Sequence, residues 1–379
     1  MKLKNSSKKL EPLYFLIVFF LLFGSLGYVM GTPNMLNTLM NTAYNLLIET
    51  VLYIMSITVI SGALGKILME FGVVGILEKL LRPLMKPLWN LPGVAALGGL
   101  ITFLSDNPAI ITLANDRNFS KYFKKYQLIS ITNFGTAFGM GLVVIVFMAG
   151  RGFASAAMIG MIGAFVGSMI STRIMQKLIL KAHPEFDSYI SDEGTQDKIV
   201  EQGEETNNGG VFLRVLNSLL DGGKQGVELG LAIIPGVLII STFVMMLTFG
   251  PGENGYTGAA YEGIALLPAI AEKLNFIFDW LFGFKNPELV AFPMTSLGAV
   301  GAALGLIPKF QASGLIDGNA IAVFTAMGMC WSGYLSTHTA MLDSLDYRGL
   351  TSKAIIAHTI GGLCAGIFAH WLFVLIGLF

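Results

Sequence analysis

Residues 95–125 read AALGGLITFLSDNPAIITLANDRNFSKYFKK, and this stretch decides the fold. Two apolar segments, residues 95–104 and 109–113, flank the polar tetrad Ser105, Asp106, Asn107 and Pro108. Each segment is too short to cross a bilayer, which takes about 20 apolar residues in a helix. Broken backbone survives at membrane depth only where it is buried in protein or lines a water-filled cavity. The stretch therefore predicts a re-entrant hairpin with a buried polar tip.

The composition around this hairpin is that of a polytopic membrane protein. Hydrophobic residues make up 54% of the 379 residues and charged residues 13%, with a mean hydropathy of +0.68. Soluble domains carry roughly 25% charged residues. No basic stripe with interleaved aromatic residues points to nucleic acid. The two cysteines lie in apolar segments, so neither a disulfide framework nor a metal site is expected.

The first half of the chain has a fixed order of segments. Residues 13–30 follow four lysines and predict an uncleaved first helix. Residues 31–42 are uncharged and read as an outer loop, and the next apolar span is 44–69. Residues 71–91 predict an interfacial arm, with leucines on one face and basic residues towards the other, in which Pro83 and Pro87 are expected to break any long helix. The hairpin and two spans, 126–148 and 154–177, complete this half, and ITNFGTAFGMG interrupts the first of these spans.

The second half repeats this order. An amphipathic lead, 211–224, enters a span at 227–249, and a second arm, 264–284, contains Pro268. Residues 288–308 predict a second hairpin with residues 292–296 as its interruption. The span 320–342 again has a polar, glycine-broken centre, GMCWSGYLSTHT, and 351–379 is the last span. An acidic, polar linker separates the halves.

The distribution of basic residues sets the orientation. With a cytoplasmic N-terminus, 20 of the 24 Lys and Arg residues fall on the cytoplasmic side. The four exceptions are Arg151, Lys273, Lys285 and Lys309. The two hairpins then enter from opposite sides. We therefore predict an all-α polytopic membrane protein with two inverted-topology repeats, each with an interfacial arm, a re-entrant hairpin and a glycine-broken transmembrane helix. The expected units are residues 1–43, the first helix and outer loop; 44–180, the first repeat; 181–224, the acidic cytoplasmic linker and lead; and 225–379, the second repeat.

The motifs GALGKILMEFGVVGILEKLLRPLMKPLW, NLPGVAALGG and SDNPAIITLAN resemble the nucleoside-recognition, or Gate, family of bacterial membrane proteins. The overall plan is similar to that of the concentrative nucleoside transporters. The resemblance covers roughly residues 44–177 and 227–379. The Glu-x-Pro signature that nucleoside transporters carry at their hairpin is replaced here by Asp106, Asn107 and Pro108. Nucleoside transporters of this plan assemble as trimers, so the resemblance implies a homo-oligomer in the inner membrane of a bacterium.

Polar side chains in the hairpins and broken spans are the candidate substrate ligands. An ionisable group such as Asp106 costs about 2.5–3.5 kcal/mol to insert, which favours a function for it. Ser105 and Asn107 can alternatively cap the half-helices. Half-helix N-termini would offer amide donors to an anionic or carbonyl-rich solute. The predicted substrate site comprises Asp106, Asn107, Thr295, Ser296, Ser332, Thr337 and His338.

A cluster of side-chain oxygens predicts an ion site. Packing through small residues explains the glycines of the broken spans but not the hydroxyl and amide groups beside them. The predicted ligands of a sodium ion are Ser105, Asn107, Asn133 and Thr136. The competing coupling ion is a proton, carried by Asp106 or His338. No metal site and no other cofactor is expected.

Two functional classes remain. The first is an ion-coupled secondary transporter of a small polar solute, with a nucleoside or related metabolite as the first guess, working by alternating access between the two hairpin tips. The alternative is a non-transporting membrane subunit or signalling scaffold of the Gate family. An enzyme is not expected, because the sequence offers no nucleophile with its base and orienter, no metal-ligand set and no phosphate loop.

Overall fold

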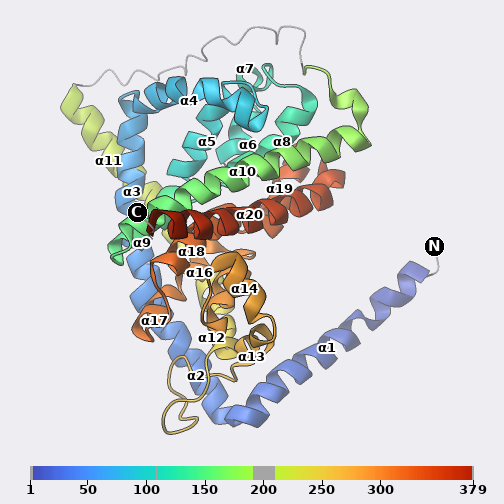
Figure 1. The fold of residues 1–379 in the computed structure, drawn as a ribbon, viewed down its shortest axis with the longest axis vertical. Coiled ribbons are helices and arrows are strands. Elements are labelled where there is room, and N and C mark those ends of the chain that lie inside the picture. The colour runs from blue at the N-terminus through green and yellow to red at the C-terminus, as the bar shows by residue number, and fades with distance from the viewer. Residues whose placement is uncertain (1–2, 108, 191–209, 378–379) are drawn as a thin grey trace.

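The computed structural model describes residues 3–107, 109–190 and 210–377, and every regular element in them is helical (Figure 1). Six helical segments are long and apolar enough to cross a membrane: Leu10–Met30, Thr32–Glu70, Lys125–Gly150, Ala154–Ala182, Val211–Thr248 and Arg348–Gly377. The expected span at 320–342 is not among them, and it consists of two short helices, Gly318–Cys330 and Tyr334–Ser344. The chain is a multi-pass, all-α membrane protein, as its composition predicts.

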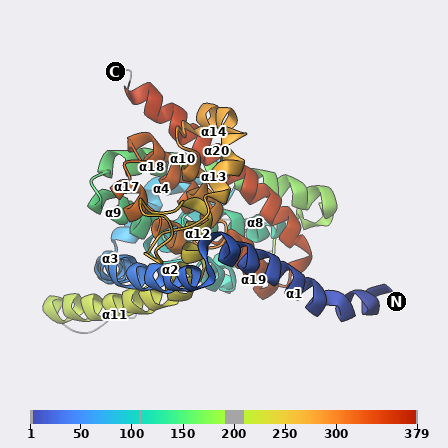
Figure 2. The same cartoon turned by 90° about the horizontal axis from the view of Figure 1, so that it is seen from below.

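The N-terminal helix α1 (Leu3–Met30) extends away from the body of the molecule (Figures 1 and 2). Residues 31–42, which we expected to form a loop, are helical from Thr32 onwards. They form α2 (Thr32–Asn45), which runs on through the π-helical turn η1 (Leu46–Val51) into α3 (Leu52–Glu70). Pro33 stands in the first turn of α2, where its missing N–H removes no helical hydrogen bond. The polar side chains of α2 bind the loop before α13, which is why a segment poor in apolar residues is ordered here.

The first arm is a single helix, α4 (Val73–Trp89), so the expectation that its prolines break it is wrong. Pro83 and Pro87 both point away from the protein, and the carbonyl groups that they leave without a helical partner are therefore on the exposed side. At the end of α4, Arg173 donates hydrogen bonds to the carbonyls of Leu88 (3.0 Å) and Pro87 (2.5 Å). These bonds replace those that the last turn lacks.

The first hairpin is confirmed. Its two half-helices, α5 (Ala95–Leu104) and α6 (Ala109–Ala114), pack against each other and are followed by the short α7 (Arg117–Ser120). The second hairpin is formed by η4 (Pro287–Val290), α15 (Ala291–Ser296) and α16 (Val300–Leu304). Residues 292–296, the expected interruption, are helical, and the chain turns at 297–299 instead. Pro293 lies early in its helix, where it is tolerated, whereas Gly298 and the extended Ala299 make the turn.

Both glycine-rich spans are interrupted where the sequence predicts. The first consists of α8 (Lys125–Thr136) and α9 (Gly141–Gly150), and we call residues 137–140 the first break. The second consists of α18 (Gly318–Cys330) and α19 (Tyr334–Ser344), and residues 331–333 are the second break. Met140 and Gly333 have positive φ angles of 56° and 67°, which end the preceding helical path.

Two long helices form the centre of the molecule. α10 (Ala154–Ala182) and α20 (Thr351–Gly377) lie side by side. In Figure 1, α5, α6 and α8 lie on one side of them, and α12 (Thr242–Thr248), α14 (Asn275–Phe282) and α16 lie on the other. Their close approach needs glycine: a Cβ on Gly163 would stand 2.7 Å from the carbonyl oxygen of Ala365. The last spans of the two predicted repeats are therefore each other's main packing partners.

The remaining elements complete the second half. The lead and the following span form the continuous helix α11 (Val211–Ala232), then η3 (Gly236–Ser241) and α12 (Thr242–Thr248), and α11 packs on α3. The second arm is α13 (Leu266–Glu272) with α14 (Asn275–Phe282), and α17 (Ile307–Ala312) follows the second hairpin. Short 3-10 turns stand after α10 (η2, Pro184–Phe186) and before α20 (η5, Arg348–Leu350). Most of the predicted acidic linker, residues 191–209, lies outside the described residues.

Candidate functional site

Asn107, at the tip of the first hairpin, contacts the second break. Its Nδ2 donates a 2.8 Å hydrogen bond to the backbone carbonyl of Ser332, a residue 225 positions away in the chain. The side chain is buried, with 3% of the residue exposed. Since a carbonyl group only accepts hydrogen bonds, this contact fixes which amide atom is nitrogen and which is oxygen. The hairpin tip is thus held by a polar contact in the interior of the molecule.

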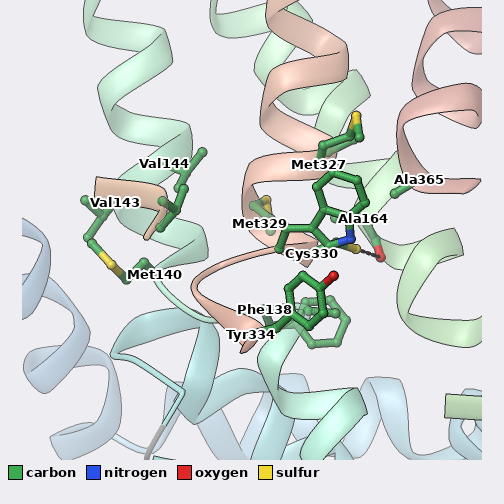
Figure 3. Packing of buried hydrophobic residues seen from close by; sticks show 14 of the residues in the cluster. Phe138, Met140, Val143, Val144, Ala164, Met327, Met329, Cys330, Tyr334 and Ala365 are labelled. Atoms are coloured by element: carbon green, nitrogen blue, oxygen red, sulfur yellow. Dashed lines mark hydrogen bonds between the residues drawn. The ribbon is translucent and has the colours of Figure 1, made fainter. Parts of the chain in front are cut away.

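The same side chain lies against the first break. A Cβ added to Gly139 would stand 1.6 Å from Oδ1 of Asn107, so any larger residue there would displace the Asn107 side chain. A Cβ on Gly141, at the start of α9, would stand 2.4 Å from Cδ2 of Phe103 in the hairpin and 3.0 Å from Cε of Met329 in α18. Figure 3 shows Met140 of the first break on one side of this region and Met329, Cys330 and Tyr334 on the other. The first hairpin tip therefore contacts both breaks.

The second hairpin reaches the second break from its other end. The backbone N–H of Gly333 donates a 3.2 Å hydrogen bond to the carbonyl of Ser296, and a Cβ on Gly333 would approach the carbonyl oxygen of Gly298 to 3.1 Å. Both hairpins and both broken spans thus meet around residues 331–333. Irregular backbone in a membrane protein needs such partners, because lipid supplies none.

One polar atom at this meeting point has no partner. Among the described residues, no hydrogen-bond donor reaches the buried Oδ1 of Asn107. A buried polar atom without a partner costs about 1–3 kcal/mol, so its retention calls for a ligand, an ion or a water molecule. Because Oδ1 is an acceptor, the missing partner is a cation or a hydrogen-bond donor.

A chain of buried polar side chains ends at the residue that precedes the second break. Asn133 donates to Ser171 Oγ (3.0 Å), Ser171 contacts His358 Nδ1 (2.8 Å), and His358 Nε2 contacts the carbonyl of Cys330. The Cys330 carbonyl requires a proton on His358 Nε2, so the neutral ring accepts from the Ser171 hydroxyl at Nδ1. This chain ties α8, α10 and α20 to the last residue of α18, which directly precedes the second break.

His338 lies beside His358, with ring centroids 4.6 Å apart. Its Nδ1 contacts the carbonyl of Tyr334 (3.0 Å) and must therefore carry the proton of the neutral ring. Nε2 is then unprotonated and can only accept a hydrogen bond, and this buried atom has no donor among the described residues. The unpartnered atoms of Asn107 and His338 are thus both acceptors.

The other predicted substrate residues are placed as follows. Asp106 is half-buried and accepts a 2.7 Å hydrogen bond from the N–H of Asn107. Ser332 lies in the second break and contributes its carbonyl group. The hydroxyls of Thr295, Ser296 and Thr337 each donate to a carbonyl four residues earlier, at 2.7, 3.0 and 2.9 Å. Asn107, Ser332 and Ser296 are brought to the meeting point, and Thr337 lies one turn along α19.

The four predicted sodium ligands do not share a hydrogen bond within the described part of the chain. The Ser105 hydroxyl donates to the carbonyl of Ile101 (2.7 Å) and that of Thr136 to the carbonyl of Thr132 (2.8 Å). Asn133 also donates to the carbonyl of Ala354 (3.0 Å) and is satisfied within the buried chain. Of these four residues, Asn107 alone has an unpaired side-chain oxygen, so it is the strongest candidate for a sodium ligand. No group of three His, Cys, Asp or Glu residues that could hold a metal occurs in the described segments.

Three residues of this region escaped the sequence analysis as individuals. Gly139 was recognised only as one of several glycines in an interrupted span, although it makes room for the hairpin tip. Ser171 lies in a span that reads as plain, and His358 reads as a packing residue. The signal that could have found Ser171 and His358 is the co-occurrence of a serine and a histidine in the two uninterrupted last spans.

The fold matches solved structures of a concentrative nucleoside transporter. An inward-facing, substrate-bound structure of CNTnw superposes with a TM-score of 0.56 at 14% identity, covering 97% of this chain and 86% of that one. An outward-facing variant gives 0.57 at 14% identity (99% and 86%), and an intermediate-state variant gives 0.57 at 13% (97% and 86%). The chain therefore has the fold of this class of membrane transporter.

The sequence match is narrower. Residues 51–152 match the Gate family model, described as nucleoside recognition, which confirms the resemblance predicted from the arm and hairpin motifs. That range includes the first hairpin and the first break. A 95-residue stretch is 35% identical to the glutamate mutase epsilon subunit of Desulfitobacterium hafniense (strain Y51), and it covers 22% of this chain. The match spans about a fifth (20%) of the length of that curated relative.

Proposed function

We propose that the protein is an ion-coupled secondary transporter of a small polar solute, with a nucleoside or a related metabolite as the first candidate. The observation that carries this proposal is the meeting of both hairpins and both broken spans at residues 331–333, with the unpaired Asn107 oxygen among them. Such a junction of interrupted helices is how secondary transporters form a substrate site near the middle of the bilayer.

The comparisons support transport as the activity. The CNTnw structures are of inward-facing, outward-facing and intermediate states, with substrate bound in the first. We transfer alternating access between two hairpin tips to this chain. The inverted arrangement of the repeats, a cytoplasmic N-terminus, the bacterial inner membrane and a homo-oligomer belong to the same proposal.

The chemistry of the unpaired atoms narrows the solute. Oδ1 of Asn107 and Nε2 of His338 accept hydrogen bonds, so the solute presents hydroxyl or N–H groups, as a nucleoside does. Oδ1 is also a suitable ligand for sodium, which prefers oxygen. A proton would instead be carried by Asp106 or His338. Both coupling ions are tested below.

The first experiment is uptake into proteoliposomes against a panel of nucleosides, nucleobases and related metabolites. We expect saturable uptake of at least one solute, and a loss of about tenfold or more in N107A, because a lost buried contact costs about 1–3 kcal/mol. Asn118, an exposed asparagine on α7, supplies the matched control N118A, which keeps wild-type uptake.

Replacing sodium by choline separates the coupling ions. Uptake that stops in choline, and follows a sodium gradient when sodium is present, identifies sodium. Uptake that is unchanged in choline but follows a pH gradient identifies a proton and removes the sodium ligands from the proposal. No saturable flux under any gradient would favour a non-transporting subunit or scaffold and overturn the transporter.

A further inference from the structure

The helix α4 has three distinct faces. One packs on the protein through Val74, Glu78, Met85 and Trp89, all of which are buried. Its C-terminal end is fixed to the body: Trp89 Nε1 donates to Ser168 Oγ of α10 (2.8 Å), and Gln127 of α8 donates to the carbonyl of Asn90 (2.7 Å). The two remaining faces of α4 are therefore held in a defined orientation.

The second face is an exposed apolar stripe. It consists of five large side chains that are 37–69% exposed: Ile76, Leu77, Leu80, Leu84 and Leu88. A water-facing helix would not retain such a stripe, whereas a helix lying at a membrane surface buries it among acyl chains. In Figure 1, α4 runs across the end of α3 rather than alongside it.

The third face is basic. Lys79 and Lys86 are exposed, and within the described residues no carboxylate oxygen lies within 4.0 Å of either ammonium group. The neighbouring Arg82 is neutralised by Glu78 at 2.7 Å. The basic and apolar stripes point roughly 140° apart on a helix of 3.6 residues per turn. The acyl chains of a lipid and its headgroup would thus meet different faces of the same helix.

From this geometry we propose that α4 binds anionic phospholipid, with Lys79 and Lys86 holding the headgroup phosphates and the leucine stripe resting on the acyl chains. Lysines next to a membrane surface are attracted to anionic lipid. The site is independent of the transport site, and its existence does not depend on the proposed function.

The second arm lacks the basic face on which the proposed binding of anionic phospholipid to α4 depends. The pair α13 and α14 exposes apolar side chains of similar size, including Phe276 (72%) and Trp280 (67%). Its exposed charges, however, are mixed: Glu272, Lys273 and Asp279. Without an excess of positive charge, this arm has no preference for anionic over zwitterionic lipid. It supplies a matched control within the same molecule.

An alternative occupant is the acidic segment 191–209, whose residues include Asp192, Glu193 and Asp197. Charge alone would let it cover the lysines. It has few apolar side chains, however, and would leave the leucine stripe exposed. A phospholipid matches both stripes, so lipid is favoured.

The test measures thermal unfolding of the full chain in nanodiscs of phosphatidylcholine with increasing phosphatidylglycerol. We expect the midpoint to rise with the phosphatidylglycerol fraction and the rise to shrink at high salt. In K79Q/K86Q, the phosphatidylglycerol fraction that gives half of the rise in midpoint should increase by more than about tenfold, because the two lysines that attract anionic lipid are lost. K273Q should respond like the wild type.

Three results would overturn the proposal. The first is an unfolding midpoint of the wild type that does not depend on phosphatidylglycerol, and the second is a K79Q/K86Q variant that responds as the wild type does. The third is a response that appears only after the acidic residues of 191–209 are replaced by Gln and Asn, which would assign the basic stripe to that segment. K79R/K86R, which retains both charges, should respond like the wild type and separates charge from helix stability.

Discussion

Gly139 illustrates how a single missing side chain makes room for the site. The hairpin residue Asn107 occupies the space where any other residue at position 139 would place its Cβ, at 1.6 Å from Oδ1. Asn107 in turn reaches the carbonyl of Ser332. A contact between three chain segments therefore depends on one hydrogen atom at Gly139.

We predict that Gly139→Ala abolishes uptake while the protein remains folded. The new methyl group must push the Asn107 side chain away, so the hydrogen bond to Ser332 is lost and the unpaired oxygen moves. The control is Gly349→Ala, where a Cβ would meet nothing within 4 Å. Transport assays and thermal unfolding of both variants provide the check. Normal uptake by Gly139→Ala would contradict the role given to the hairpin tip.

At the scale of elements, glycine sets how closely two spans approach. α3 and α11 are in contact over much of their length, and the Thr58 hydroxyl donates a 2.7 Å hydrogen bond to the carbonyl of Gly226. A Cβ on Gly226 would stand 2.3 Å from the carbonyl oxygen of Thr58. This is a backbone atom of a long helix, so it cannot move aside.

Gly226→Ala should therefore destabilise the protein by about 1–3 kcal/mol, the usual cost of overpacking. Gly223→Ala is the matched control on the same helix, because its Cβ would meet only a Val59 methyl group at 3.7 Å. Chemical or thermal unfolding in detergent measures the difference. Equal stability of the two variants would show that α3 and α11 separate easily.

The elements also show what local patterns miss. Proline predicts the end of a helix, yet α4 contains Pro83 and Pro87 and continues, because the carbonyls that they leave unpaired are on the exposed side. Arg173 separately binds the carbonyls of the last turn. The second hairpin turns at 297–299 rather than at Pro293, because a proline in the first turn of a helix removes no hydrogen bond. In both segments the position of proline within its helix mattered more than its presence.

At the scale of the whole molecule, Glu262 joins the two halves of the chain. Its buried carboxylate accepts hydrogen bonds from Thr257 (N–H and hydroxyl), the N–H of Gly258 and the hydroxyl of Thr38 on α2. Asn34 and Asn41 of α2 donate to backbone carbonyls of the same loop, each at 2.8 Å. The polar residues 31–42 thus anchor a loop more than 200 positions away.

The Glu262 anchor predicts a pH dependence of stability. Burial alone would raise the pKa of Glu262, but the donors from Thr257, Gly258 and Thr38 stabilise the carboxylate, and the net pKa is lowered. Its contribution to stability is then present above the unfolded pKa of about 4.3 and is lost as the pH falls through the lower folded value. We expect Glu262→Gln to lower the unfolding midpoint near neutral pH.

The same variant should lose less stability than the wild type between about pH 5 and about pH 3, because it has no proton to take up at this position. Glu253→Gln, in the same loop but exposed, is the control and should follow the wild type. An identical decline in all three proteins would assign the acid sensitivity to other carboxylates.

The sequence alone determined the class of protein, the order of its elements and the places where three of the four interrupted elements break. These depend on local properties, since hydropathy over about 20 residues and the positions of glycine and polar residues act within one segment. It also identified Asn107 as a candidate, because a polar residue in a short apolar segment is costly wherever the segment goes.

Only the tertiary structure decided which breaks meet and which polar atoms remain unpaired. Asn133 and Thr136 looked like ion ligands, but Asn133 is satisfied by Ser171 and by Ala354, 221 positions away, and Thr136 by its own helix. Asn107 keeps a free oxygen although it bonds Ser332. A hydrogen bond is a property of two atoms, and when its partners are distant in the chain, folding alone brings them together.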